Sequence, residues 1–264
     1  HKDKISFIPH AIPKNIFYPL DKEIIQKNKV VLLGEERKDH FVCLWVNRNA
    51  KRKRPSDAIW AWKIFLDGIE KDYGHRNATL IMHTEPNDQE GPNLFNVVEI
   101  LGLKNNVFFS RDRIDFEKMN VIYNICDVTL STSYAEGFGL STLESMMTGT
   151  PIVAPKTGGL TRQVVDHRDG TENGAALPID LKTLVGSQSV PYIYEDYVSV
   201  ETVAEGIRKV YNLDDEARSQ LSDKVYKYAS EEFGYQKTVD AWHESMISAI
   251  DEFKNYKSWN KITI

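Results

Sequence analysis

The sequence predicts an α/β fold, a Rossmann-like three-layer α/β/α sandwich built around a parallel sheet, with extra helices at its C-terminal end. Short apolar segments rich in strand-forming residues alternate with segments whose apolar residues recur at helical spacing. This strict alternation implies right-handed crossovers and a parallel sheet that is covered on both faces. The 264-residue chain is 41% hydrophobic and 27% charged, an ordinary globular composition, and its length allows roughly 70% of the unfolded surface to be buried.

The expected elements follow one another from the first buried strand onward. The strands are expected at Phe41–Val46, Leu80–Met82, Val107–Phe109, Val128–Leu130 and Ile152–Ala154. The helices between them are expected to begin at Pro55 and to include Leu94–Leu101, Met119–Tyr123 and Leu140–Met147. Pro55 suits a first helical turn, where its missing N–H costs little, while Gly102 and Gly149 stand where two of these helices should end.

The N-terminal stretch KISFIPHAIPKNIFYPL departs from this alternation. It contains three prolines and has no amphipathic period, which is typical of an extended connector. We therefore expect residues 1–36 to form a connector and lead-in, and residues 37–264 to form the folded domain.

Two segments nearer the C-terminus also stand apart. One is a helical stripe of large apolar residues: Val239, Trp242, Met246, Ile250 and Phe253. The tail KSWNKITI continues the apolar character beyond it, so stripe and tail need a surface to pack on. The other segment, LKTLVGSQSVPYIYEDYV within residues 180–198, is expected to be an irregular surface insertion.

Charge, hydropathy and cysteine usage exclude several classes of protein. The 33 basic and 38 acidic residues give a net charge of −5, which disfavours a general nucleic-acid binder. The longest apolar runs fall well short of the ~18–20 residues that a transmembrane helix needs. Cys43 and Cys126, the two cysteines, lie in apolar segments typical of a core, not of a metal site or disulfide framework. We therefore expect a reducing, cytoplasmic location, and leave peripheral attachment to a membrane open.

The most informative segment is STSYAEGFGLSTLESMMTGTPIVA, which begins in an expected strand and continues into a glycine loop and a helix. Gly137 and Gly139 let the backbone approach a ligand closely, and the following helix points unpaired N–H groups and its positive dipole end at the loop. Ligands of doubly wound folds bind at this carboxyl edge of the sheet. We therefore expect an anion seat here, with Glu136 and Glu144 reaching different parts of the ligand.

This segment resembles the signature of the retaining, metal-independent glycosyltransferases of the two-Rossmann-domain B fold, in the large family 4 group. Their signature is a Glu, seven residues and a second Glu in an E-G-F-G-L context, and this sequence reads EGFGLSTLE. The resemblance implies that Glu136 contacts the transferred sugar, that the loop amides hold the diphosphate and that Glu144 holds the ribose. It assigns these donor-binding residues to the loop and helix: Gly137, Phe138, Gly139, Leu140, Ser141 and Glu144. A capping box formed by Ser141 and Glu144 is a structural alternative that does not exclude a ligand role.

A second element of the family is an Arg, four residues and a Lys in the loop after the first strand of the donor-binding domain. VNRNAKRKRP places Arg48 and Lys53 at that spacing, and the resemblance makes them catalytic together with Glu136. Without a divalent metal, charge on the departing diphosphate needs fixed cations. Lys51, Arg52 and Arg54 crowd the same loop and leave the assignment open by one position. A nuclear-import or nucleic-acid patch is the alternative, and the acidic chain disfavours it.

The resemblance extends to most of residues 1–180. IPHAIPKNIFYPL is similar to the family's interdomain connector, with Ala11 in place of the usual glycine, and TGGLTRQVVDHRDG is similar to its Gly-Gly segment. Gly158 and Gly159 are expected to form a turn near the sugar. Arg162 stands where the family tends to have a Glu.

Two further residues lie after the second and third expected strands. His83 occupies the place of a glycine-rich turn, and it is either a structural hydrogen-bonding residue or part of the donor pocket. Arg111 is placed among the donor-binding residues. The His-Thr pair that starts at His83 resembles mannosyltransferases that use GDP-mannose.

The resemblance implies the donor-binding part of an enzyme that moves a hexose from a nucleoside diphosphate sugar, GDP-mannose or UDP-glucose, to a sugar or glycan acceptor with retention of configuration. It implies no metal and no cofactor beyond the donor. The acceptor-binding N-terminal Rossmann domain is expected to lie outside these residues, so this part should bind donor without transferring sugar alone. The alternatives are a non-catalytic nucleotide-sugar-binding module and a glycoside hydrolase that uses Glu136 and Glu144 as its carboxylate pair.

Overall fold

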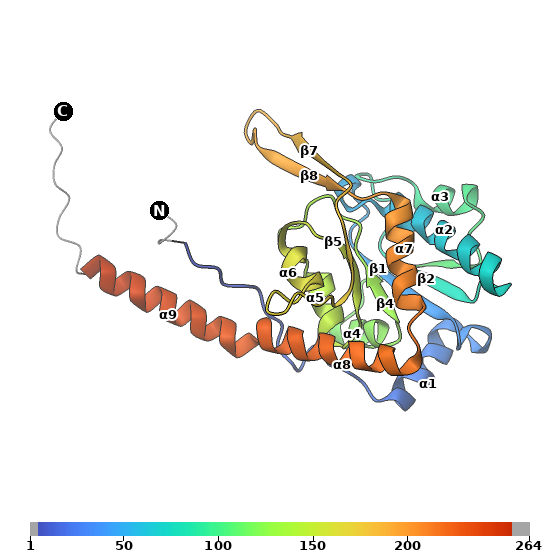
Figure 1. Cartoon of the computed structure of the whole chain (residues 1–264), viewed down its shortest axis with the longest axis horizontal. Coiled ribbons are helices and arrows are strands. Elements are labelled where there is room, and N and C mark those ends of the chain that lie inside the picture. The colour runs from blue at the N-terminus through green and yellow to red at the C-terminus, as the bar shows by residue number, and fades with distance from the viewer. Residues whose placement is uncertain (1–4, 255–264) are drawn as a thin grey trace.

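The computed structural model describes residues 5–254 and confirms the layered α/β architecture (Figure 1). Its centre is a six-stranded sheet of order β3-β2-β1-β4-β5-β6, in which neighbouring strands run parallel. The strands are β1 (Phe41–Val46), β2 (Ala78–His83), β3 (Val107–Ser110), β4 (Val128–Leu130), β5 (Ile152–Pro155) and β6 (Gly174–Leu177). The first five confirm the expected strands. The sequence does not predict β6, because its residues GAAL are too small and too few to give an apolar signal.

Helices cover both faces of this sheet. The α-helices are α1 (Lys22–Leu33), α2 (Pro55–Tyr73), α3 (Leu94–Ile100), α4 (Phe116–Asn124), α5 (Leu140–Met147), α6 (Thr161–Val164), α7 (Val200–Tyr211), α8 (Asp215–Glu232) and α9 (Tyr235–Lys254). Short 3-10 helices occupy η2 (Glu35–Arg37), η3 (Lys51–Lys53) and η4 (Gly158–Leu160). One apolar cluster joins the sheet to α2, α3 and α7, and another joins the opposite face to α4, α5, α6 and α8.

Strand β1 shows why the sandwich could be predicted. Successive side chains of a strand point to opposite faces. Cys43 and Trp45 pack in the first apolar cluster, whereas Val42 and Leu44 pack in the second. A strand that is buried on both faces needs a continuous apolar run, which FVCLWV supplies. Cys43 and Cys126 are both buried free thiols, as expected for core residues.

Two regions differ from the sequence-based expectation. Residues 180–198 are not irregular: they form an antiparallel hairpin of β7 (Leu181–Val185) and β8 (Ile193–Tyr197). Aromatic and β-branched residues favour these strands, and the Gly, Ser and Pro residues of the turn between them conceal the pattern. The lead-in contains a helix that the sequence analysis does not expect, α1, which packs beside α4 and η2.

The long helix α9 projects away from the sandwich beside the N-terminal segment (Figure 1). Its expected apolar stripe is exposed along its length: Val239 by 41%, Trp242 by 53%, Met246 by 54%, Ile250 by 48% and Phe253 by 81%. Ile12 of the connector forms an isolated parallel bridge to Gly234, at the junction of α8 and α9. The tail KSWNKITI lies outside the described residues.

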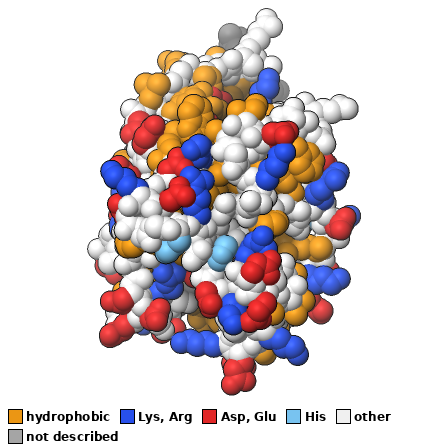
Figure 2. Space-filling view, turned by 90° about the vertical axis from the view of Figure 1, so that its right-hand side faces the viewer, with side chains coloured by type: hydrophobic (Ala, Val, Ile, Leu, Met, Phe, Trp, Pro, Cys, Tyr) orange, Lys and Arg blue, Asp and Glu red, His pale blue; other side chains and the backbone are white. Residues whose placement is uncertain are grey.

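Charges of both signs are mixed over the surface in the view of Figure 2, which faces the right-hand side of Figure 1. Basic side chains there lie among acidic ones and do not gather into one field. Across residues 5–254, no helix combines the length and apolar character needed to cross a membrane.

Candidate functional site

The loops after β1 and β4 meet at the carboxyl edge of the sheet. These strands are neighbours, with Cys43 in register with Val128. The backbone N–H of Tyr134 donates to the carbonyl of Arg52 over 3.0 Å, and the hydroxyl of Thr132 donates to the carbonyl of Lys53 over 2.9 Å. These two bonds fasten the basic loop to the segment that leads into the glycine loop.

The fastening brings Lys53 and Glu136 together. Their side chains form an ion pair in which the lysine is 10% exposed and the glutamate 15% exposed. The Arg52 guanidinium lies 3.9 Å from the same carboxylate oxygen. Burial lowers the pKa of Lys53, and the bond to Glu136 offsets part of that effect. Two cations therefore share one carboxylate, which leaves one positive charge in excess for a ligand.

The glycine loop adds hydrogen-bond donors to these cations. Gly139 precedes α5 with a φ of 92°, a conformation that favours glycine. Within the described part of the chain, the backbone N–H groups of Gly137, Phe138 and Leu140 donate no hydrogen bond. Free N–H groups at the start of a helix, beside excess positive charge, are the features of an anion seat.

Gly158 and Gly159 lie directly against this loop. The N–H of Gly159 donates to the carbonyl of Glu136 over 2.9 Å, and a Cβ at Gly159 would lie 2.5 Å from the Cα of Phe138. A Cβ at Gly158 would collide with the Glu136 carbonyl. The expected turn is present as the start of η4, and its backbone lies in close contact with that of the glycine loop. A pocket of about 580 Å³ opens beside it, with Glu136, Phe138 and the exposed Lys156 in its wall.

Glu144 lies one helical turn into α5 and is more buried than its sequence position suggests. Its carboxylate accepts a hydrogen bond from the Tyr123 hydroxyl over 2.7 Å. Burial raises the pKa of Glu144, and the tyrosine bond opposes that rise. The capping box is not formed, since α5 begins after Gly139 with no side-chain cap. Ser141 therefore lies in the first turn without capping it.

The other sequence-predicted residues are not brought to Glu136. Arg48 binds Asp88 through two hydrogen bonds of 2.7 and 3.1 Å. His83 shares a hydrogen bond of 3.0 Å with Ser110, and its burial lowers its pKa. Arg111 forms a 3.2 Å ion pair with a carboxylate in the loop after β2. These residues line the carboxyl ends of β1, β2 and β3, beside the Glu136 cluster but not in contact with it.

Sequence reasoning missed the residues that hold the site together. Arg54 adopts a left-handed backbone with a φ of 52° before α2. Its guanidinium lies 4.8 Å from the ring centre of Tyr134 and 5.6 Å from that of Tyr197 in the hairpin. The two tyrosine rings are 4.2 Å apart, so the base of the hairpin packs on the segment that precedes Glu136. The cluster of basic residues gave no signal for this role, which depends on long-range contacts.

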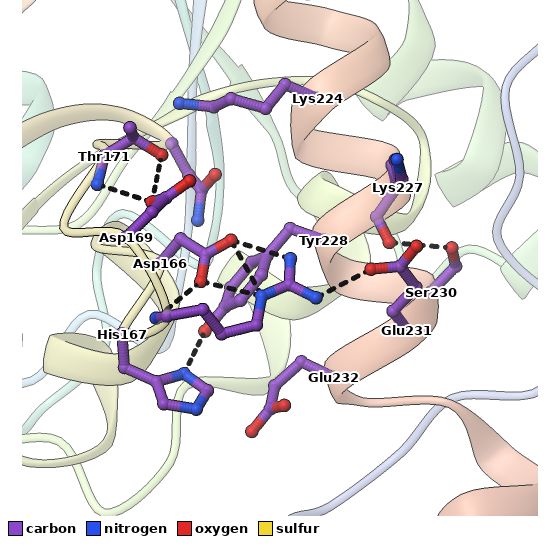
Figure 3. Close-up of polar contacts among 12 residues, drawn as sticks. Asp166, His167, Asp169, Thr171, Lys224, Lys227, Tyr228, Ser230, Glu231 and Glu232 are labelled. Atoms are coloured by element: carbon purple, nitrogen blue, oxygen red, sulfur yellow. Dashed lines mark hydrogen bonds and ion pairs between the residues drawn. The ribbon is translucent and has the colours of Figure 1, made fainter.

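A separate ionic network braces the loop after α6 (Figure 3). The Arg168 guanidinium binds Asp166 and Glu231, each at 2.7 Å, and lies 4.9 Å from the ring centre of Tyr228. The Tyr228 hydroxyl also donates to the carbonyl of Arg162, whose side chain pairs with the last residue of α8 at 2.6 Å. Arg162 thus links α6 to α8 through its backbone carbonyl and its side chain.

Among the described residues, no three His, Cys, Asp or Glu side chains gather as a potential metal site. The sequence-based expectation of a metal-independent reaction stays a prediction.

Residues 29–177 match the family model of glycosyl transferases group 1. A D-inositol 3-phosphate glycosyltransferase from Stackebrandtia nassauensis is 29% identical over 170 residues, which is 64% of this chain and 37% of that protein. The match thus spans well under two thirds of that relative's length.

Solved structures share the architecture. The Anabaena protein HepE in complex with UDP-glucose superposes with a TM-score of 0.68 at 20% identity, over 90% of this chain and 56% of that one. The C-terminal domain of the glycosyl transferase group 1 family protein LpcC from Francisella tularensis gives 0.62 at 19% identity, over 85% of this chain and 100% of that one. At these identities the likeness shows the fold.

Proposed function

The chain belongs to the glycosyl transferases group 1 family, and we propose that it is the donor-binding part of an enzyme that transfers a hexose from a nucleoside diphosphate sugar with retention of configuration. The observation that carries this proposal is the buried Lys53–Glu136 pair beside a glycine loop whose N–H groups lack partners in the described chain. The donor diphosphate would occupy that seat.

The chemistry asked of this site is electrostatic. Cleavage of the donor places negative charge on the departing diphosphate, and a fixed ammonium at Lys53 together with the N–H groups of Phe138 and Leu140 would stabilise it. Glu136, placed beside the lysine, would accept hydrogen bonds from the hydroxyls of the transferred sugar. The proposal also includes Arg48, which the sequence signature assigns to the departing diphosphate together with Lys53. These groups act on the transition state without a protein nucleophile or a metal.

The proposal assigns Glu144 to the nucleotide ribose. Burial beside Tyr123 raises the pKa of the Glu144 carboxylate. Keeping this group ionised at neutral pH therefore lowers the stability of the folded chain, and a bound ligand that donates hydrogen bonds to it would offset that cost. A ribose diol supplies two donors that an ionised carboxylate accepts well.

UDP-glucose and GDP-mannose are the donors we propose. The HepE complex contains UDP-glucose, and the relative from Stackebrandtia nassauensis is named for an inositol phosphate acceptor, which makes a phosphorylated polyol one acceptor to test. We propose that a second Rossmann domain binds the acceptor, supported by the exposed stripe of α9 and by the 56% coverage of HepE.

The two alternatives differ in how they fit this site. A hydrolase would need Glu136 and Glu144 to act as a pair across a glycosidic bond. Here Lys53 holds one carboxylate and Tyr123 holds the other, which argues against that use. A non-catalytic module would be expected to lack Arg48, Lys53 or Glu136, and this chain has all three.

Calorimetric titration of the chain with UDP-glucose, GDP-mannose and ADP-glucose tests the proposal. We expect one of them to bind in the micromolar to millimolar range, roughly the range of enzyme substrates. Glucose 1-phosphate, which lacks the nucleoside, serves as the matched control and should bind more weakly. Absence of binding by all three donors would overturn the proposal, whereas release of sugar from a phosphate-free glycoside would favour the hydrolase.

A further inference from the structure

Gln163 packs against the glycine loop and is fully buried, although its side chain ends in a polar amide. It belongs to α6, the short helix that follows the turn at Gly158 and Gly159. A buried amide is costly unless its donors and its acceptor find partners inside the fold. The partners of Gln163 therefore indicate what this side chain does in the folded chain.

The amide nitrogen of Gln163 donates to two carbonyl groups of the glycine loop. The donor–acceptor distance is 2.7 Å to the carbonyl of Phe138 and 3.1 Å to the carbonyl of Gly139. The Thr142 hydroxyl is within hydrogen-bond distance of the Gln163 Oε1 and of the Gly139 carbonyl. The opposite orientation of the amide would set its oxygen against two carbonyl oxygens. These contacts therefore hold the amide in one orientation.

The segment that carries Gln163 is itself well fixed. The buried side chain of Asn173 donates to the Gln163 carbonyl over 2.8 Å, and the Asn173 N–H donates to the carbonyl of Val164 over 2.8 Å. Leu160 and Val164 are fully buried in the apolar core beside the sheet. The Gln163 side chain thus reaches the glycine loop from a packed and hydrogen-bonded base.

The two bonds from Gln163 determine where the N–H groups of the loop point. Every peptide bond of the described chain is trans, so a carbonyl and the N–H of the next residue point in roughly opposite directions. Because the carbonyls of Phe138 and Gly139 face Gln163, the N–H groups of Gly139 and Leu140 point away from it. Neither N–H donates a hydrogen bond within residues 5–254. Both therefore stay available to a ligand.

The loop needs such bonds because its own sequence does not fix its shape. Gly137 and Gly139 can adopt backbone conformations that other residues avoid, and Gly139 has a φ of 92°. A Cβ at Gly137 would meet no atom within 4 Å, so packing does not restrain the backbone there. A loop without these bonds would have to become ordered when an anion binds, which lowers the affinity.

We propose that Gln163 is a positioning residue, which holds the carbonyls of the glycine loop so that the loop N–H groups face the donor diphosphate before it binds. The inference rests on the proposed function and deepens it. Gln163 acts through the loop and does not contact the diphosphate itself. Donors that are already oriented stabilise a negative charge better than donors that must first reorient. Gln163 should therefore affect the binding of the diphosphate and not that of the nucleoside.

Titration of the chain and its variants with UDP and GDP tests this role, with uridine and guanosine as probes that lack phosphate. Gln163→Met keeps most of the side-chain volume and removes both donors. For the diphosphate that the wild type binds, we expect affinity to fall by about 10-fold, roughly the effect of losing one or two hydrogen bonds that hold the bound conformation. Affinity for the matching nucleoside should not change, because the nucleoside does not need the loop N–H groups.

A matched pair of substitutions at Thr142 tests the same role, and it decides the question if Gln163→Met does not fold. Thr142→Val removes the hydroxyl that contacts the Gln163 amide and should weaken diphosphate binding by about three- to fivefold. Thr142→Ser keeps a hydroxyl at this position and should bind the diphosphate as the wild type does. Equal diphosphate affinity in these two variants would contradict the role of the amide.

Ser145→Ala is the control for a general loss of stability. The Ser145 hydroxyl is buried toward the C-terminal end of α5, where it bonds to the Thr129 hydroxyl and the Thr150 carbonyl. The melting temperature should fall in this variant as in Gln163→Met, while diphosphate affinity stays unchanged.

Two results with a folded Gln163→Met would overturn this inference alone: unchanged diphosphate affinity, or an equal loss of affinity for the diphosphate and its nucleoside. A loss of diphosphate affinity in Ser145→Ala as large as that in Gln163→Met would also overturn it. If the wild-type chain binds neither diphosphate, the proposed function fails and this inference fails with it.

Discussion

Two ionic clusters in this chain balance their charges in opposite ways. In the cluster at the carboxyl edge of the sheet, Lys53 and Arg52 share the single carboxylate of Glu136. In the cluster between α8 and the loop after α6, the single guanidinium of Arg168 is matched by Asp166 and Glu231 (Figure 3). The first cluster has a spare positive charge and the second has none.

This difference in charge balance indicates that the Glu136 cluster binds a ligand and that the Arg168 cluster stabilises the fold. Polar groups that serve only structure are expected to be satisfied within the chain, because an unmatched buried group is costly. The Glu136 cluster combines spare charge with N–H groups that lack partners in the described residues, so a ligand is expected to complete it. Substitutions in the two clusters should therefore affect different properties: ligand affinity in the first and stability in the second.

The largest expected effect on binding comes from Lys53→Gln. We expect diphosphate affinity to fall by about 100-fold, similar to the effect of removing one donor from an oxyanion hole. The melting temperature should fall only modestly, because Arg52 stays beside the Glu136 carboxylate and the amide of the glutamine can still donate a hydrogen bond to it. Calorimetry and thermal melting measure the two outcomes. Lys63→Gln, on the outer surface of α2, is the control, and an affinity loss as large in that variant would show a general charge effect.

Arg168→Ala should produce the converse result. It removes the guanidinium donors of Asp166, whose side chain is 6% exposed, and leaves only the backbone N–H of residue 168 as a donor. We expect a loss of about 1–2 kcal/mol in the free energy of unfolding. Urea denaturation measures this loss, while the affinity for UDP or GDP should stay within about threefold. A stable variant with weakened diphosphate binding would contradict the distinction between the clusters.

Glu144→Gln tests whether a buried carboxylate is kept for binding. Donor affinity should fall by about tenfold, from the loss of one charge-assisted contact to the ribose. Burial raises the pKa of Glu144, so the folded chain holds this proton more tightly and stability falls as pH rises through the folded pKa. The glutamine cannot ionise, so its unfolding free energy should lose that pH dependence. Equal donor affinity in both proteins would exclude the ribose role.

The smallest effect expected near neutral pH is the titration of Lys53. Burial lowers its pKa, so its ammonium is lost at a lower pH than that of an exposed lysine. Diphosphate binding requires the ammonium, and affinity should therefore decline as pH rises into the alkaline range. Titrations in a pH series measure the decline, and Lys53→Gln should lack it. A decline of the same size in that variant would assign the titration to another group.

The sequence could predict the features that depend on local pattern. The apolar run FVCLWV identifies a strand that is buried on both faces, and the E-G-F-G-L context identifies the glycine loop. The Lys53–Glu136 ion pair was not predicted, because it depends on β1 and β4 being neighbours in the sheet.

Features that depend on distant partners could not be predicted. The signature spacing selects Arg48, but the carboxylates that engage it follow another strand, some 40 residues along the chain. Glu144 matches a capping pattern, yet Tyr123 from α4 engages its carboxylate. The hairpin at Leu181–Val185 and Ile193–Tyr197 is stabilised at its base by Tyr134 and was concealed by its turn residues.

The most direct test of the account compares the affinities of the wild-type chain for UDP and uridine, and for GDP and guanosine, by calorimetry at one ionic strength. The spare positive charge and the loop N–H groups predict that, for the base that the chain accepts, the diphosphate binds at least about 100-fold more tightly than the nucleoside. Equal affinity for the diphosphate and its nucleoside would contradict the central claim that the Glu136 cluster is built to hold a diphosphate.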